Sequence, residues 1–377
     1  MLQNKWMRTI TAVGLTGAVL VLMIIFFFLP KQEYSEKENR YLATFPEWNW
    51  TDVRSGEYMG DVTDYLSDHF PFRDFFMGLK TDAEMAMGKQ EINEVYIAED
   101  DYLIEAYQTP ANTERIVETL KNFYEKLDTE KLEVNLMLVP TASYVHADKL
   151  PQFAPSLSQM ETAEIIYEQT GIPAIDCSDR LLEQADTDRL FYKTDHHWTT
   201  YGAYQGYLEY CEVKGLTPVA LEDLSAETVT TEFYGTIYSK VNDYSRKGDE
   251  ITIYTNPTDD LTVRYIDTEE TSDSLYNMEY LEKKDKYSMF LDNLHTLIEI
   301  TNENAESEDV LVLIKDSYAN SMVPFLTTHY QKIYVFDTRY YKQGPSKFID
   351  EHPEVTDVLL LYNMNTLDTD TGIRGIY

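Results

Sequence analysis

Val310-Leu311-Val312-Leu313-Ile314 is an uninterrupted apolar run, and Lys315-Asp316-Ser317 follows it directly. A short apolar run rich in β-branched residues predicts a strand that is buried on both faces. Because a helical pattern comes next, Ser317 would lie at a strand-to-helix turn, where its hydroxyl is exposed and the first helical N–H groups can stabilise an oxyanion. Ser317 is therefore a candidate nucleophile, although a serine that only caps a helix would occupy the same position.

Further apolar runs flank this strand in both directions along the chain. They are separated by helical patterns such as 112–127 and 161–170, and they lie at 132–139, 172–176, 333–336 and 358–362. This alternation predicts an α/β fold with a doubly wound, mostly parallel sheet. Sites in such sheets form outside the carboxyl ends of the strands. We therefore expect five segments to meet at that edge, around Pro140, Asp195, Ser317, Asp337 and Asn363.

The alternation of strands and helices is interrupted between about residues 221 and 304. This segment contains polar, β-prone pieces such as 251–254 and 261–265. It predicts a β-rich insertion into the α/β domain. The expected organisation is a cytoplasmic N-terminus and membrane anchor over 1–30, a linker and helical region over 31–90, and a catalytic domain over 91–377.

The N-terminus contains a candidate membrane-spanning segment. No charged residue occurs from Thr9 to Pro30, a length close to the roughly 20 residues that span a bilayer. Lys5 and Arg8 precede it and favour a cytoplasmic N-terminus. The run ends in Phe-Phe-Phe-Leu-Pro, without a small-residue cleavage site, so an uncleaved anchor is favoured over a signal peptide. The chain is predicted to be a single-pass protein of the cell membrane with its catalytic domain outside.

Charge and cysteine content narrow the possible partners. The net charge of −35 argues against binding of nucleic acid and against electrostatic docking on anionic lipid. The apolar fraction of 43% is sufficient for a globular core. The two cysteines, Cys177 and Cys211, are too few for a disulfide scaffold, although one bridge between them stays open.

A second candidate stretch is Lys193-Thr194-Asp195-His196-His197-Trp198-Thr199-Thr200. It holds two of the seven histidines, and no other two histidines are adjacent. A histidine that acts as general base needs a carboxylate to fix its tautomer. Asp195 and His197 are two positions apart, so in an extended segment their side chains point to the same side. With Ser317 expected at the same edge of the sheet, the sequence predicts a Ser317–His197–Asp195 triad.

Donors to an oxyanion are harder to assign from sequence. The backbone N–H of Ser317 is the first candidate. The side-chain amides of Asn363, Asn365 and Asn293 follow apolar runs and could supply others, although each could equally be an ordinary loop residue.

A metal site is the competing interpretation of the same residues. Asp195, His196 and His197 are all ligand types, and an Asp-His-His string also occurs in a family of metal-dependent phosphodiesterases. Such a site needs further aspartates after other strands, and Asp176 and Asp337 do not lie in matching motifs. Adjacent histidines also seldom reach one ion from one loop. We therefore assign neither a metal nor another cofactor.

Asp195-His196-His197-Trp198 together with Asp316-Ser317-Tyr318 resembles the DHHW family. More distantly, the sequence is similar to the SGNH-like domains of the alginate O-acetylation proteins AlgX and AlgJ. Glu38-Asn39-Arg40 and Asp68-x-Phe70-Pro71-x-Arg73 also look like the membrane-proximal region of the DHHW family. The resemblance implies an SGNH-like fold, with Ser317 as nucleophile, His197 as base and Asp195 as the residue that orients the base.

The resemblance also implies acyl transfer at the cell surface. Related proteins work beside a membrane-bound O-acyltransferase that supplies acetyl groups, and they acetylate hydroxyls of an exopolysaccharide or wall glycan. Tyr318 and the pair Tyr340-Tyr341 could stack on sugar rings. Two alternatives stay open: an acetyl-esterase that uses the same triad with water as acceptor, and a non-catalytic scaffold of a polysaccharide-modifying complex.

Overall fold

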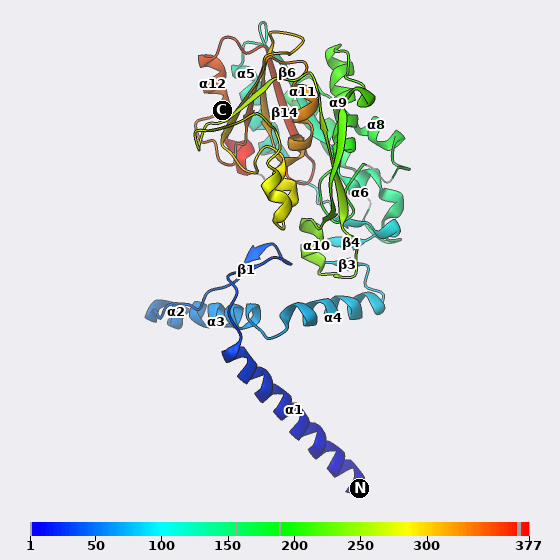
Figure 1. Cartoon of the computed structure of the whole chain (residues 1–377), viewed down its shortest axis with the longest axis vertical. Coiled ribbons are helices and arrows are strands. Elements are labelled where there is room, and N and C mark those ends of the chain that lie inside the picture. The colour runs from blue at the N-terminus through cyan, green and yellow to red at the C-terminus, as the bar shows by residue number, and fades with distance from the viewer. Residues whose placement is uncertain (1, 156, 188–189, 368–370, 377) are drawn as a thin grey trace. The chain divides into compact units, whose positions relative to one another are not determined.

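The computed structural model describes residues 2–155, 157–187, 190–367 and 371–376. These residues form two compact units. The N-terminal unit consists of Met1–Lys89 with Asn242–Tyr244, and the sheet unit consists of Gln90–Val241 with Ser245–Tyr377 (Figure 1).

The sheet unit is built on a seven-stranded sheet with the order β10-β9-β11-β13-β12-β14-β6. The four strands from β13 to β6 pair in parallel, and β10, β9 and β11 continue the sheet in antiparallel pairing beyond β13. The strands are β6 Glu133–Val139, β9 Leu261–Tyr265, β10 Glu270–Ser272, β11 Leu297–Asn302, β12 Val310–Lys315, β13 Lys332–Phe336 and β14 Asp357–Asn363.

Helices cover both faces of this sheet, because the buried strands send alternate side chains to opposite sides. Leu311 and Leu313 of β12 pack in the core that contains α9, whereas Val312 and Ile314 pack in the core that contains α5 and α7. The predicted α/β class is thereby confirmed. The helices of this unit are α5 Thr113–Lys126, α6 Ala142–Val145, α7 Gln159–Thr170, α8 Ser178–Glu183, α9 Thr200–Lys214, α10 Thr236–Val241, α11 Val323–Leu326 and α12 Pro345–Glu351.

One predicted strand, 172–176, does not form a ladder. Among the described residues it makes a single parallel bridge to β6, between Ala174 and Leu136. Pro173 is the physical reason, since proline has no N–H to donate to a ladder. The remaining contacts are the bonds from Leu136 N to Pro173 O and from Ile175 N to Leu136 O, both 2.9 Å long.

The segment 221–304 is β-rich, and its strands take two different positions. β7 (Ser225–Phe233) and β8 (Asp249–Thr255) form an antiparallel pair of their own. β9, β10 and β11 instead extend the central sheet, with β11 paired to β13. A separate antiparallel sheet, from an earlier part of the chain, consists of β3 (Glu91–Ile92), β4 (Val95–Ile97) and β5 (Leu103–Glu105).

The stretch 193–200 is anchored by its tryptophan and by the helix that follows. Thr199 caps α9 by accepting a hydrogen bond from Gly202 N at 3.1 Å. Trp198 is fully buried, and a Cβ at Gly206 would come within 2.8 Å of its ring. Glycine at position 206 thus lets α9 approach the indole closely.

Both cysteines are buried in the sheet unit and unbridged. Cys177 precedes α8 and Cys211 lies within α9. Burial in apolar surroundings raises the pKa of the Cys211 thiol to about 12, which keeps it protonated and unreactive.

The N-terminal unit consists of one long helix, a small hairpin and three shorter helices. Its elements are α1 Leu2–Phe28, β1 Tyr34–Ser35, β2 Arg40–Tyr41, α2 Trp50–Ser55, α3 Glu57–Asp68 and α4 Arg73–Ala86. Residues Trp6–Phe28 of α1 are long and apolar enough to cross a membrane.

Ion pairs join the hairpin to the start of α4. The Arg40 guanidinium binds Asp68 Oδ2 at 2.9 Å and Glu38 Oε2 at 2.8 Å. Arg73 also binds Glu38, and Ala43 N donates to Asp68 Oδ2 at 2.8 Å. The motif pieces 38–40 and 68–73 are therefore in direct contact within this unit.

Candidate active site

Ser317 lies just after the end of strand β12, which pairs in parallel with β13 on one side and β14 on the other. It is the first residue of the short 3-10 helix η6 (Ser317–Ser321), and Asp316 caps that helix by accepting from Tyr318 N at 2.8 Å. The side chain of Ser317 is half-buried, whereas its two neighbours are buried. Only the serine therefore remains partly accessible in this turn.

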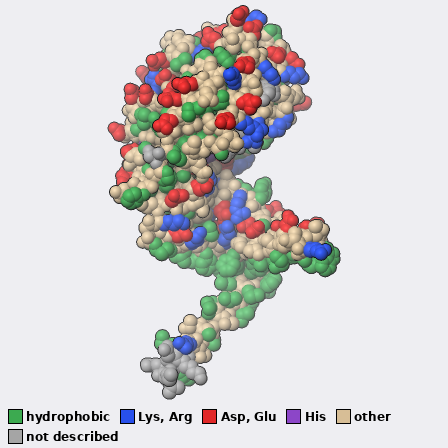
Figure 2. Space-filling view, turned by 180° about the vertical axis from the view of Figure 1, so that it is seen from behind, with side chains coloured by type: hydrophobic (Ala, Val, Ile, Leu, Met, Phe, Trp, Pro, Cys, Tyr) green, Lys and Arg blue, Asp and Glu red, His purple; other side chains and the backbone are tan. Residues whose placement is uncertain are grey.

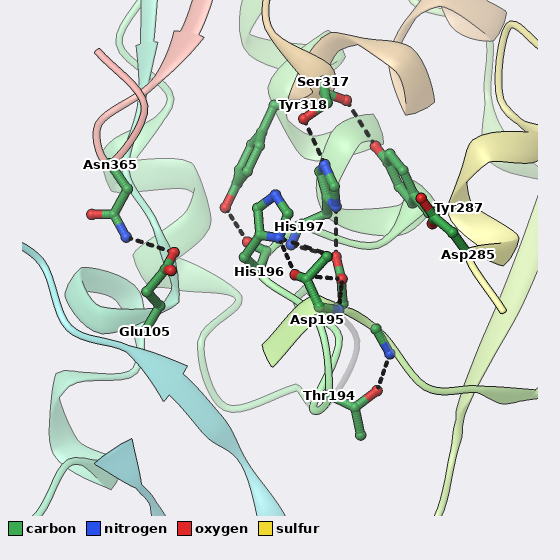
Figure 3. Close-up of polar contacts among 12 residues, drawn as sticks. Glu105, Thr194, Asp195, His196, His197, Asp285, Tyr287, Ser317, Tyr318 and Asn365 are labelled. Carbon is green, nitrogen blue, oxygen red and sulfur yellow. Dashed lines mark hydrogen bonds and ion pairs between the residues drawn. The ribbon is translucent and has the colours of Figure 1, made fainter. Parts of the chain in front are cut away.

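Asp195, His197 and Ser317 form one continuous hydrogen-bonded chain (Figure 3). His197 Nδ1 donates to Asp195 Oδ1 at 2.5 Å, and His197 Nε2 lies 2.8 Å from Ser317 Oγ. Because Nδ1 carries the proton that Asp195 accepts, Nε2 is free to accept the hydroxyl proton of the serine. The structure brings together the three residues that the sequence predicted as a triad.

Asp195 is held by donors from Thr236, the first residue of α10. Its Oδ2 accepts from Thr236 N at 2.8 Å and from Thr236 Oγ1 at 3.1 Å. The neighbouring residue must be glycine, because a Cβ at Gly235 would lie 2.2 Å from Oδ2 of Asp195. Burial by itself would raise the pKa of Asp195, but His196, His197 and the hydrogen bond from Thr236 N outweigh it and hold the pKa well below its usual range. Asp195 is therefore ionised and can orient an imidazole.

His197 is buried and neutral at physiological pH. Burial, reinforced by the neighbouring His196, lowers the pKa of His197 to about 4, although Asp195 acts in the opposite direction. A neutral imidazole is the form that can take a proton from serine.

Aromatic side chains fix the position of both triad loops. The ring of Tyr287 stacks on the His197 imidazole with centroids 3.8 Å apart and an interplanar angle of 11°. The Tyr287 hydroxyl donates to Ser317 O at 3.0 Å. Trp198 Nε1 donates to Tyr318 O at 2.9 Å, and Tyr318 Oη donates to His196 O at 2.5 Å. Tyr318 is fully buried, so its ring presents no surface on which a sugar could stack.

The three asparagines that the sequence offered as oxyanion donors have different hydrogen-bond partners. Asn363 is buried, and its Nδ2 donates to Asp316 Oδ2 at 2.8 Å and to Thr366 Oγ1 at 3.0 Å. Both of its amide hydrogens are thus used in holding the turn before Ser317. Asn365 Nδ2 donates to Glu105 Oε2 at 3.3 Å, and Asn293 Oδ1 accepts from Ser288 Oγ at 3.1 Å.

His196 does not belong to the hydrogen-bonded chain of the triad. Its Nδ1 lies 2.7 Å from Thr236 Oγ1, and its partly exposed ring borders a cavity of about 570 Å³. Polar side chains line much of this cavity: Glu94, Glu105, Gln108, Thr236, Lys240 and Asn365. Burial by itself would raise the pKa of Glu105, but His196 and Lys240 outweigh it and lower the pKa, so the cavity carries an ionised carboxylate.

Asp195, His196 and His197 also form the group of metal-ligand types expected from the sequence, with ligand atoms within 4.8 Å of one another. In this structure, hydrogen bonds within the site engage Asp195, His197 and Nδ1 of His196. The two further aspartates considered for a metal site are bound within their own loops. Asp176 accepts from Ser178 N at 2.9 Å, and Asp337 binds Arg339. The hydrogen bonds within the site join Asp195 and His197 to Ser317 and Thr236, and His196 to Thr236.

Sequence reasoning missed several residues that hold this site. Tyr287 and Thr236 come from the β-rich segment, and no local pattern distinguishes them from the other tyrosines and threonines. Asp316 was visible beside Ser317, but its four bonds to Tyr318, Asn363 and Thr366 depend on β14 lying next to β12. Among these supporting residues, Thr236 has one local signal in the sequence: the glycine before it, Gly235, which allows the backbone to approach Asp195 closely.

Comparison with known proteins places this architecture among solved structures. A DHHW family protein from Eubacterium siraeum is 24% identical, with a TM-score of 0.65 over 75% of this chain and 96% of that one. Bacillus cereus PatB1, in a structure with a sulfonyl adduct, is 19% identical, with a TM-score of 0.62 over 75% of this chain and 98% of that one. The O-acetyltransferase domain of Pseudomonas putida AlgJ is 14% identical, with a TM-score of 0.47 over 73% and 92% of the two chains.

The family assignment rests on the sequence itself. No curated protein matches the chain. The sequence model described as "DHHW protein" matches residues 79–336, which covers more than half of the chain and includes both Asp195-His196-His197-Trp198 and Ser317. The predicted resemblance is confirmed, and the chain belongs to the DHHW family.

Proposed function

We propose that this protein transfers acetyl groups to hydroxyls of an exopolysaccharide or wall glycan through an acetyl-Ser317 intermediate. The observation that carries the proposal is the chain Asp195–His197–Ser317, with contacts of 2.5 and 2.8 Å and a half-buried serine at its end. Nucleophile, base and orienting carboxylate in this order are the parts that acyl transfer to and from a serine requires.

In the first step, His197 Nε2 takes the proton of Ser317 Oγ while Oγ attacks the carbonyl carbon of an acetyl donor. The tetrahedral intermediate collapses, the bond to the leaving group breaks, and His197 returns the proton to that group. Asp195 stabilises the imidazolium that forms in between. The backbone N–H of Ser317, at the first position of η6, is the proposed donor to the oxyanion.

In the second step, a sugar hydroxyl gives its proton to His197 Nε2 and attacks the acetyl carbon. The bond to Ser317 Oγ breaks, and the serine recovers its proton from His197. The cavity beside His196 supports a polyhydroxylated acceptor, because its carboxylate, amide and hydroxyl side chains can exchange hydrogen bonds with sugar hydroxyls. Water in place of the sugar would make the same site an esterase.

The proposal includes a location and a partner. Helix α1 would anchor the chain in the cell membrane, with residues 91–377 outside as the catalytic domain and residues 31–90 next to the membrane. A membrane-bound O-acyltransferase is the proposed supplier of acetyl groups, because a tethered domain would meet its donor at the same membrane. The acceptor is the polysaccharide outside the cell.

The decisive experiment compares wild type with Ser317→Ala, using the full chain in detergent and an activated acetyl ester as donor. Intact-mass measurement should find one added acetyl group on wild type and none on Ser317→Ala. Ser274→Ala is the matched control, since that serine lies in the loop after β10 and its Oγ bonds Tyr276 N and Tyr276 O. It should be acetylated like wild type.

An oligosaccharide acceptor then separates the remaining alternatives. Acetylated sugar supports transfer, and free acetate with unmodified sugar supports an esterase. Absence of an adduct on correctly folded wild type, with glycan acetylation in cells unaffected by Ser317→Ala, would favour the scaffold and refute the proposed catalysis.

A further inference from the structure

The N-terminal unit exposes large apolar side chains that do not cover its own core. We name six of them the outer apolar face: Trp50, Met59, Leu66, Phe72, Phe75 and Leu79. Their exposed fractions lie between 46% and 74%. Single exposed apolar residues are ordinary, but a contiguous group marks an interaction surface. Figure 2 shows hydrophobic side chains gathered along one side of α2–α4 and continuing onto α1.

Helix α4 has the reverse of the polarity expected for a helix on a soluble protein. Phe72, Phe75 and Leu79 follow one another at helical spacing and point outward. Away from these three side chains, Thr81 is buried, and a Cβ at Gly78 would lie 2.9 Å from the Tyr244 ring. Small and polar residues thus pack inward while phenylalanines face outward. Such a helix is stabilised when an apolar partner covers its outward side.

Helix α3 repeats the arrangement. Met59 and Leu66 are exposed, whereas Tyr58 and Tyr65 are half-buried. Asp61 is exposed on the side of the helix opposite Met59, two positions away at 100° per residue. The helix therefore presents an apolar stripe and an acidic stripe to its surroundings, as helices that lie in a membrane interface do.

Helix α3, which carries part of the outer apolar face, contacts the apolar helix α1. Phe26, near the end of α1, contacts the Tyr65 ring of α3 with centroids 6.2 Å apart. Lys31 Nζ donates to Phe26 O at 2.6 Å and lies over the Phe26 ring, as expected of a lysine at the level of the lipid headgroups. Tryptophans are enriched at the same level, and Trp48 and Trp50 are both exposed.

We infer that α2, α3 and α4 lie on the surface of a lipid bilayer, with the outer apolar face inserted among the headgroups and upper acyl chains. The contact with α1 supports this location through the proposed anchor role of α1, whereas the reversed polarity of α3 and α4 is independent of that role. With a net charge of −35, binding depends on burial of apolar area and not on attraction to anionic lipid. The N-terminal unit would thereby be held flat on the membrane instead of swinging on a single helix.

The test uses the full chain with single introduced cysteines carrying an environment-sensitive fluorophore. Phe75→Cys reports on the outer apolar face, Asp61→Cys on the acidic stripe and Val21→Cys on α1. Both native cysteines are buried, and wild-type protein treated with the same fluorophore measures how much label they take up. Circular dichroism confirms that each variant keeps its helices. The labelled proteins are reconstituted in phosphatidylcholine vesicles at a low ratio of protein to lipid.

The label at position 75 should be quenched several-fold more by brominated lipid than by aqueous iodide, and the label at position 61 should show the opposite. Neither phosphatidylserine nor high salt should change this result. Equal iodide quenching at 61 and 75 overturns the inference, as does cross-linking of two copies through position 75 without lipid quenching. Quenching at 75 but not at 21 would uphold the surface contact while refuting the anchor.

Discussion

Around the triad, aromatic side chains are buried and hydrogen-bonded, whereas in the N-terminal unit the same residue types face outward. Trp198 and Tyr287 are buried and donate to Tyr318 O and Ser317 O. Trp50 and Phe75 are 74% and 65% exposed, and their ring contacts are with other aromatic rings of the same unit. A buried aromatic side chain that is hydrogen-bonded to the backbone holds the site in place and is called a brace below. An aromatic side chain left on the surface is available to contact another molecule. Composition does not distinguish these two roles.

The two units should differ most in the free energy of unfolding that is lost when one phenylalanine of each is replaced by alanine. Phe233 is fully buried and Phe75 is exposed, and each makes an edge-on contact with one aromatic ring, Tyr192 and Phe76 respectively. Phe233→Ala should lower the free energy of unfolding by about 3–5 kcal/mol, because it leaves a cavity. Phe75→Ala should change it by about 0.5 kcal/mol or less. Denaturant titration in detergent measures both values, and equal losses would contradict the contrast between a buried ring of the sheet unit and an outward-facing ring of the N-terminal unit.

Next in size is the effect of removing the ring that stacks on the base. Tyr287→Leu should lower the rate of Ser317 acetylation by about 10²-fold, because the imidazole loses the surface that orients it. Tyr287→Phe keeps the ring and loses only the hydroxyl bonds to Ser317 O and Ser321 Oγ, so a loss of about 10-fold is expected. The donor KM should stay constant in both variants. Equal rates for Leu and Phe would show that the stack has no positioning role.

A smaller effect is expected from the cavity beside His196. Glu105→Gln removes the negative charge that faces the proposed acceptor and should raise the acceptor KM by about 10-fold. Acetylation of Ser317 from the donor should be unchanged. Glu91→Gln, an exposed position on β3, is the control and should behave as wild type. A loss of acetylation itself in Glu105→Gln would place Glu105 in the support of the triad and not in acceptor binding.

The smallest change is expected on moderate acidification. Burial lowers the pKa of His197 to about 4, so the imidazole stays neutral and acetylation should be nearly constant from about pH 7 to pH 5. The rate should fall to half only near the pKa of His197. A half-point near the ordinary histidine pKa of about 6.5 would show that burial does not control this group.

The same depressed pKa fixes the sign of the effect on stability. Between about 6.5, the unfolded value, and about 4, the folded value, the unfolded chain binds the additional proton. The contribution of His197 to stability is therefore lost as the pH falls through this window. Thermal unfolding of His197→Gln should depend less on pH across the same window than that of wild type.

Much of the sheet, and the proximity of Asp195, His197 and Ser317, could be predicted from local sequence. The runs at 132–139, 310–314, 333–336 and 358–362 form strands because apolar β-branched residues suit a sheet buried on both faces. The rule that parallel strands gather their ends at one edge was sufficient to place Ser317 near His197. The prediction of a strand at 172–176 was wrong, because Pro173 has no N–H to donate and the segment forms one isolated bridge instead of a ladder.

The residues that support the triad could not be predicted, since they come from segments remote in the chain. Thr236 binds Asp195 across 41 positions, and Tyr287 binds Ser317 across 30. Asn363 was expected near the site and does lie beside it, but its amide is bound to Asp316. Which atom an amide faces depends on the neighbouring strand, and residue type carries no information about that.

The sequence by itself determined the α/β class, the apolar N-terminal helix and the three residue types of the triad, because periodicity, length and chemistry are local properties of a chain. Tertiary structure alone decided which aromatic rings brace the site and which face outward, and which donors hold Asp195. Those outcomes depend on burial and on hydrogen-bond partners. Both arise only when segments distant in sequence pack against each other.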